Sequence, residues 1–383
     1  MRELLSGAPR WAALLGQFAH GAAWVLLFWI ATSQGVVGLS DAGIAWIHLV
    51  ALGWVTLTAL AILIPLIPSA TGVRWRAPRL QHLALAAFAI AAVSFPAAWL
   101  VDVRAVPAVG GLLLAAVALY VVLGIWTLMG ALRGERVERA VARAFSISLS
   151  FFFVVAILGA MLAGTLTVTD IPPWFADLAR AHGLLALLGW LTLLIYGVSA
   201  RTLRLLFNVR SRLLFAHIAV GTLGMAGAIV LAIGAGAGSQ MTIWVGAVAM
   251  AIAAIAFAVD TLDIVGRARS APVSRAFVAA SILWSLVAVV LGFGVLIGRD
   301  WSDAFGYVVL VGWIGQMLDA HLASLARPLP AWLAFVAFQS AVLYGLVGLL
   351  DGFAAPVALA AAFGGLGWCA SIVAMGSAYR PIE

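Results

Sequence analysis

The chain has 383 residues, of which 65% are hydrophobic and only 9% are charged. A soluble domain of this length cannot bury so large an apolar fraction, so the composition excludes a water-soluble globular protein and favours a lipid environment. The formal charge of +7 comes from Arg residues in short loops, a pattern that reports membrane topology and does not indicate nucleic-acid binding.

Apolar runs separated by Arg, Asp, Pro and Gly predict an all-α polytopic membrane protein with twelve transmembrane helices and no strand, in a single domain over residues 1–383. The opening segment MRELLSGAPR is too polar for a cleavable signal, so the first apolar run is expected to remain as a helix. In chain order, we predict helices over residues 10–32, 43–67, 79–101, 105–132, 143–167, 174–203, 211–234, 240–264, 274–298, 304–326, 330–350 and 354–377.

The Arg residues alternate between loops along this series of helices. All except Arg104, Arg180 and Arg299 fall at the chain ends or in every second loop, whereas the other loops carry Asp102, Asp170 and further acidic residues. Because cytoplasmic loops are enriched in basic residues, the pattern predicts that both termini are cytoplasmic in a bacterial-type inner membrane.

The pair Gly-Trp recurs in the second, sixth and tenth predicted helices, in the contexts HLVALGWVTLTAL, LLALLGWLTLLIY and YVVLVGWIGQMLD. The spacing is about four helices each time, although a further Gly-Trp pair at 367–368 lies outside this register. We interpret the chain as three pseudo-symmetric four-helix arcs. The arcs cover approximately residues 10–132, 143–264 and 274–377.

His48 and His182 lie early in two of these Gly-Trp helices, both near the outer surface, with His48 roughly 9 Å deep. Intramembrane ionisable groups usually face a bundle interior or a ligand, and neutral imidazole is the usual protein ligand of haem iron. The two residues are therefore predicted to ligate one b-type haem. The alternative is that each imidazole forms a hydrogen bond to a neighbouring helix.

Other residues are candidates for the same cofactor site. Glycine beside tryptophan would let a flat macrocycle approach the helix backbone. His20 is a third haem-site or proton-path candidate, and Tyr307 stands five residues before Gly312, as His48 stands before Gly53. The simpler alternatives are ordinary packing and, for Tyr307, an interfacial aromatic belt. The further cofactor-binding candidates are His20, Gly53, Trp54, Gly189 and Tyr307.

A second group of histidines lies near the cytoplasmic helix ends, one in each proposed arc: His82, His217 and His321. Three imidazoles could bind copper or zinc, although hydrated interfacial side chains are the commoner outcome. The lone Cys369 leaves no disulfide framework and no cysteine-based metal site. No nucleotide loop or catalytic triad is found, so the catalytic residues are not predicted.

The helix count, the threefold pattern and the His-bearing helices resemble subunit I of the haem–copper oxidases. Within that group, IHLVALGWVTLTALAILIPLIPSATG is similar to the NnrS family, which are haem- and copper-containing membrane proteins linked to nitric oxide stress. AHGLLALLGWLTLLIYGVSAR is loosely similar to another helix of that family. The resemblance implies a haem b protein, with copper as a further cofactor, that handles nitric oxide or oxygen or transfers electrons from a quinol or cytochrome.

The sequence departs from this resemblance at specific positions. Haem–copper oxidases carry an HxH pair on helix 10 and adjacent histidines on helix 7, where this chain has only His321 and His217. NnrS-type relatives have a second histidine and an acidic residue where this chain has Trp46 and Leu49. These differences argue against an oxygen-reducing centre. The resemblance implies a haem ligand only at His48 and, with less support, at His182.

Two other classes remain open. Twelve helices with internal repeats also describe secondary transporters, which should show broken helices and a central polar site. A degenerate oxidase homologue could keep the fold as a cofactor-free assembly partner. In every case the lipid bilayer is the first expected partner, nucleic acid is not expected, and a homo-oligomer is compatible with the sequence.

Overall fold

The computed structural model describes residues 7–35, 40–134, 136–168, 170–323 and 328–376, apart from the side chains of residues 136–138, 200, 214, 215 and 217. These parts of the chain are helical and contain no strand, as predicted. The elements are α1 Ala8–Ser33, α2 Asp41–His48, η1 Leu49–Thr56, α3 Leu57–Thr71, α4 Pro78–Val101, η2 Val103–Ala105, α5 Val106–Ala131, α6 Arg136–Gly164, η3 Thr165–Thr167, α7 Phe175–Leu184, η4 Leu185–Thr192, α8 Leu193–Phe207, α9 Leu214–Gly236, α10 Gln240–Arg267, α11 Pro272–Leu296, α12 Ser302–Tyr307, η5 Val308–Gly315, α13 Gln316–Ala323, α14 Pro328–Asp351 and α15 Ala354–Gly376.

Within the described residues, 11 helices are long and apolar enough to cross a membrane, and the chain is a polytopic helical membrane protein. The twelfth predicted span, 304–326, is helical from Ser302 to Ala323 but is not among them. Its second half carries Gln316, Asp319 and His321, which make it more polar than the other spans. Neighbouring helices cover this segment, because every residue of η5 is buried.

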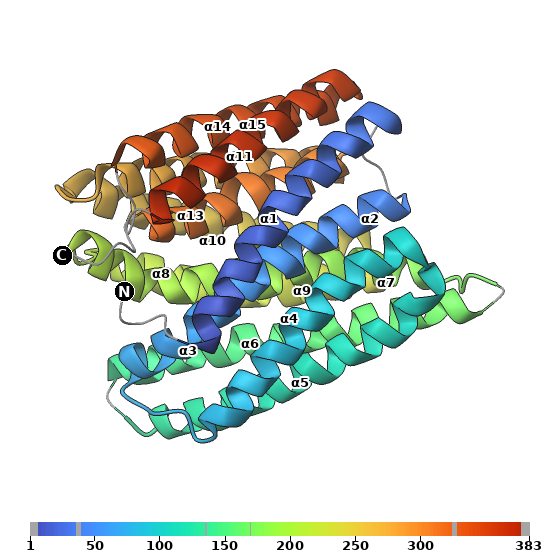
Figure 1. The fold of residues 1–383 in the computed structure, drawn as a ribbon. Coiled ribbons are helices and arrows are strands. Elements are labelled where there is room, and N and C mark those ends of the chain that lie inside the picture. The colour runs from blue at the N-terminus through green and yellow to red at the C-terminus, as the bar shows by residue number, and fades with distance from the viewer. Residues whose placement is uncertain (1–6, 36–39, 135, 169, 324–327, 377–383) are drawn as a thin grey trace.

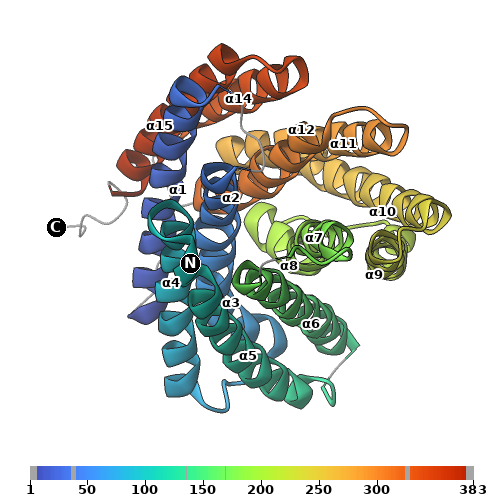
Figure 2. The same cartoon turned by 90° about the vertical axis from the view of Figure 1, so that its right-hand side faces the viewer.

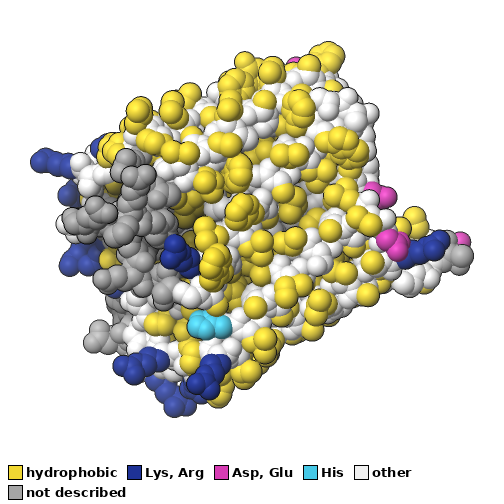
Figure 3. Space-filling model, viewed as in Figure 1, with side chains coloured by type: hydrophobic (Ala, Val, Ile, Leu, Met, Phe, Trp, Pro, Cys, Tyr) yellow, Lys and Arg dark blue, Asp and Glu magenta, His cyan; other side chains and the backbone are white. Residues whose placement is uncertain are grey.

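The long helices lie side by side along a common direction, with the connections at two opposite ends of the bundle (Figure 1). Figure 2 shows the same bundle from one of these ends. Most basic side chains in view gather at one end, the acidic ones lie towards the other end together with a smaller basic group, and hydrophobic side chains lie between (Figure 3). We call these the Arg-rich end, where the connection from α3 to α4 carries Arg74, and the opposite end, where Asp102 follows α4.

Three of the central helices share an unusual feature, a π-helical segment of 8 residues. The sequences LVALGWVT, LALLGWLT and VVLVGWIG place Gly and Trp at the fifth and sixth positions each time. π-Helical turns are rare, because their wider rings leave the backbone less well packed. Hydroxyl groups bond to carbonyls of two of these segments: Thr192 donates to Leu187 O at 2.7 Å, and Ser281 donates to Trp313 O at 2.9 Å.

The three π-helical segments meet in the middle of the bundle. Segment η5 contacts both η1 and η4. A hydrogen bond joins η4 to η1, since the Trp190 indole N–H donates to Thr56 Oγ1 at 3.2 Å. Trp54 and Trp190 are among the largest fully buried side chains described. The repeated Gly-Trp pattern therefore marks the contact surface of three central helices.

The glycine of each pair lets a neighbouring helix come close. A Cβ atom at Gly53 would lie 3.0 Å from Ala19 Cβ, and one at Gly189 would lie 2.8 Å from Phe151 Cδ1. A Cβ atom at Gly312 would lie 3.0 Å from Trp284 Cβ. A larger residue at any of these positions would separate the central helices from their neighbours.

Candidate functional site

His48 and His182 come together in the half of the bundle nearer the opposite end. Their ring centroids lie 6.4 Å apart, and the ring planes differ by 22°. His48 is the last residue of α2, and His182 lies in α7, three residues before η4 begins. The structure thus brings together the two imidazoles that the sequence analysis pairs, and their role as metal ligands stays a prediction.

Each imidazole is held through its Nδ1 atom. His48 Nδ1 lies 2.8 Å from Ile44 O, one turn earlier on the same helix. His182 Nδ1 lies 3.1 Å from Val155 O on α6. A carbonyl oxygen only accepts, so Nδ1 carries the proton in both rings and the lone pair of a neutral ring is on Nε2.

The Nε2 atoms of His48 and His182 make no hydrogen bond to any residue that the structure describes. Metal-binding histidines usually donate their second ring N–H to a carbonyl or carboxylate, which fixes the ring and directs the other nitrogen to the metal. Both imidazoles have this arrangement. Both side chains are half-buried.

Gly159 on α6 makes room for the His182 ring. A Cβ atom at this position would lie 2.9 Å from His182 Cε1, closer than real contacts allow. The side of His48 is bounded by Phe95 of α4, whose ring centroid lies 5.0 Å away at a tilt of 56°. Helices α4 and α6 therefore supply the walls of the site, and α2 and α7 supply the imidazoles.

The spacing of the two rings suits a single metal ion between them. A metal–imidazole bond is about 2 Å long and the ring centre lies roughly 1 Å further out, so two imidazoles on opposite sides of one metal have centres about 6 Å apart. The observed separation is 6.4 Å. This separation is compatible with one iron atom that both imidazoles would hold, and Gly159 leaves the space that the His182 ring needs.

The other predicted contacts of the cofactor lie elsewhere in the bundle. Gly53 faces Ala19, and Gly189 faces Phe151, so the structure gives both glycines a role in helix packing. Trp54 stacks on His20. A contact of these residues with a macrocycle stays a prediction.

His20 lies in a buried aromatic cluster. Its ring is stacked on Trp54 at a centroid distance of 3.4 Å with planes 5° apart, and Phe338 lies 5.5 Å away. Both ring nitrogens are buried without a hydrogen-bond partner, as are Gln17 Nε2 and Thr58 Oγ1. The structure thus places His20 against Trp54 and Phe338, away from the ring contact between His48 and His182.

Tyr307 is the residue of the third arc that corresponds in register to His48. It is buried, stacks on Trp46 at a centroid distance of 6.0 Å, and donates its hydroxyl hydrogen to Ala341 O at 2.9 Å. This position is inside the bundle and does not match an interfacial aromatic belt. Through Trp46, Tyr307 packs on the helix that carries His48.

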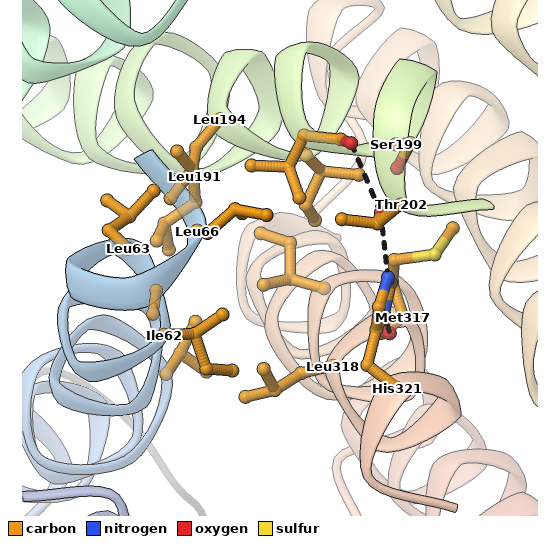
Figure 4. A pocket seen from close by; sticks show the side chains of 15 residues that line it. Ile62, Leu63, Leu66, Leu191, Leu194, Ser199, Thr202, Met317, Leu318 and His321 are labelled. Carbon is orange, nitrogen blue, oxygen red and sulfur yellow. Dashed lines mark hydrogen bonds between the residues drawn. The ribbon is translucent and has the colours of Figure 1, made fainter. Parts of the chain in front are cut away.

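Near the Arg-rich end, His321 lines a pocket of about 80 Å³ between α3, α8 and α13, with almost entirely hydrocarbon walls (Figure 4). His321 Nδ1 lies 2.8 Å from Met317 O, and Nε2 lies 2.8 Å from Thr202 Oγ1. Both nitrogens of His321 therefore have protein partners.

The other two histidines of the group predicted near the cytoplasmic helix ends, His82 and His217, give less information. His82 is half-buried in the first turns of α4, and the side chain of His217 lies outside the described residues. Among the side chains that the structure describes, no group of three or more His, Cys, Asp or Glu gathers as a metal site. The three-histidine copper or zinc site stays a prediction.

Sequence reasoning did not anticipate a buried chain of polar side chains beside η5. The Trp284 indole N–H donates to Gln339 Oε1 at 2.9 Å, and Gln339 Nε2 donates to Gln316 Oε1 at 2.7 Å. This chain links α11, α14 and α13 within the apolar bundle. Its only signal in the sequence was the presence of Gln316 and Gln339 within otherwise apolar helices.

Comparison with known proteins adds no relative. Neither a protein-family model nor a curated protein matches this sequence.

Proposed function

We propose that the protein is an integral membrane b-type haem protein, with His48 and His182 as the two axial ligands of one haem. The observation that carries this proposal is the imidazole pair, 6.4 Å apart, with each Nδ1 bound to a backbone carbonyl and each Nε2 left for a ligand. The sequence resemblance to haem–copper oxidase subunit I and the NnrS family supports the same reading.

The chain's own residues would hold and orient the cofactor. Ile44 O and Val155 O would fix the two rings through their Nδ1 atoms. When bound, haem supplies one-electron chemistry and gas binding. A haem held by both imidazoles would suit electron transfer from a donor such as a quinol or a cytochrome, and a haem held by one imidazole would suit the binding of nitric oxide or oxygen.

The same proposal includes a topology. The segregation of Arg residues at one end supports a bacterial-type inner-membrane protein whose Arg-rich end and both termini are cytoplasmic (Figure 3). The matching π-helical segments support three related four-helix arcs and twelve spans, with Ser302–Ala323 as the central span of the third arc. The haem then lies in the outer half of the membrane.

A carrier for polar solutes has less support. Such a carrier needs a polar site near the middle of the membrane. The pocket between the three central helices, bounded by Leu63, Leu194 and Ile314 among others, is lined almost wholly by hydrocarbon. No observation favours a cofactor-free assembly partner over the haem protein.

The decisive experiment is an optical spectrum, with metal analysis, of the protein purified from cells supplied with a haem precursor. We expect a Soret band and about one iron per chain, since one imidazole pair holds one haem. His48→Ala and His182→Ala should each remove or shift the band.

The matched control is His321→Ala, which changes an imidazole that already has two partners. Its Soret band should equal that of the wild type. A colourless wild-type protein, or spectra that are unchanged in both His48→Ala and His182→Ala, would refute the proposal.

A further inference from the structure

The largest cavity described in the molecule does not touch His48 or His182. It has a volume of about 500 Å³ and lies between α7, η4, α9, α10, α11, α12 and η5. Its walls are mainly hydrocarbon. Ligand pockets in proteins commonly have this size and this apolar character with a few polar groups.

Small side chains create the cavity. On α10, Ala247, Ala251 and Ala254 recur at helical spacing and line it, and on α11 the positions are Ala288 and Gly292. Larger side chains at these positions would fill the space, as large side chains do elsewhere in the core. The result is a trench that follows the helix axes. From Gln240 at one end to Ala254 at the other it runs for about 20 Å, at about 1.5 Å per residue.

The trench has one polar, exposed end and one buried end. Arg180, Gln240 and Ser302 line it at the opposite end of the bundle, and all three are exposed. Tyr196, Trp313 and Ala254 line it near the middle of the bundle, and all three are buried. It therefore runs from the region of the lipid headgroups to about the middle of the bundle.

We infer that this trench binds one acyl chain of an anionic membrane phospholipid, with the phosphate at Arg180. A narrow apolar trench does not hold water, and in a bilayer the molecule at hand to fill it is the lipid. The Arg180 guanidinium pairs with Asp177 at 3.6 Å and keeps further N–H donors for a phosphate. A neutral quinone head would not need this cation. The inference does not depend on the haem.

The test is native mass spectrometry of the protein purified in a mild detergent, before and after addition of phosphatidylglycerol, phosphatidylcholine or ubiquinone. We expect one phospholipid to stay bound after purification, and phosphatidylglycerol to bind more tightly than phosphatidylcholine. Ala251→Phe should fill the trench and abolish the bound lipid. Ile252→Phe, on the lipid-facing side of the same helix with 47% exposure, should keep it.

Arg180→Gln should reduce the preference for phosphatidylglycerol roughly tenfold, the scale of one charge-assisted contact. Arg299→Gln, which removes an exposed arginine that does not line the trench, should leave the preference unchanged. If Ala251→Phe does not fold, Ala288→Phe fills the trench from α11 instead. Retention of only a quinone or a haem, no retained lipid at all, or equal lipid binding by a folded trench-filling variant would overturn the inference.

Discussion

The imidazoles of His182 and His321 lie in comparable helices but differ in how many of their ring nitrogens have a hydrogen-bond partner. His182 has one nitrogen on Val155 O and is half-buried beside a second imidazole. His321 has one nitrogen on Met317 O and the other on Thr202 Oγ1. Both lie in the central Gly-Trp helices, His182 in the half nearer the opposite end and His321 near the Arg-rich end.

This difference separates a ligand site from a structural contact. A histidine with one nitrogen fixed and one free is oriented for a metal, whereas one with two protein partners already has its hydrogen bonds. Both residues are histidines in mainly apolar helices, so it is their hydrogen-bond partners that separate a candidate ligand from a structural contact. Three substitutions would break or sharpen the comparison.

The largest effect is expected at Gly159, which contacts His182 without being a ligand. Gly159→Leu should push the ring away from its position, because even a Cβ atom would lie 2.9 Å from His182 Cε1. Haem affinity should fall roughly 10- to 100-fold, the range seen when the support of a metal ligand is lost. Haem titration of the apoprotein measures this.

The control for Gly159 is Gly164→Leu, which lies on the same helix with no atom within 4 Å of an added Cβ. Its haem affinity should be that of the wild type. Equal affinities of the Gly159 and Gly164 variants would show that His182 does not hold the cofactor.

A smaller effect is expected at the inner histidine. Thr202→Val removes the hydroxyl that lies 2.8 Å from His321 Nε2 and should lower the free energy of unfolding by about 1 kcal/mol, because the His321 ring loses this hydrogen bond. Thermal unfolding in detergent measures the loss. The Soret band should not change, and a lost or shifted band would place His321 in the cofactor site.

The smallest effect is expected at His20. The two ring nitrogens of His20 are buried without a hydrogen-bond partner. His20→Phe keeps an aromatic ring stacked on Trp54 and removes these two unsatisfied polar atoms. We expect a Tm equal to or slightly above that of the wild type, since apolar replacement of unsatisfied groups is neutral or stabilising. Loss of the haem in this variant would instead identify His20 as part of the haem site.

The positions of the helices followed closely from the sequence. The predicted span 43–67 is helical over Asp41–Thr71, and the predicted span 79–101 is Pro78–Val101. Ends shifted by a few residues, because capping and the last turns depend on local contacts. The predicted span 304–326 is the one that is not among the apolar membrane-length helices, and η5 in it is fully buried by other helices. Its second half carries the polar Gln316, Asp319 and His321.

The sequence by itself determined that the chain crosses a membrane many times, because apolar runs of this length have no other stable solvent. It also located the Gly-Trp pattern and the two outer histidines. Only the tertiary structure decided that the three patterns form π-helical segments, that their glycines serve helix packing, and that His182 meets His48 whereas His321 meets Thr202. The physical reason is that hydropathy fixes the depth of a residue along its helix, whereas the rotation of the helix and the identity of its neighbours depend on side-chain packing across the whole bundle.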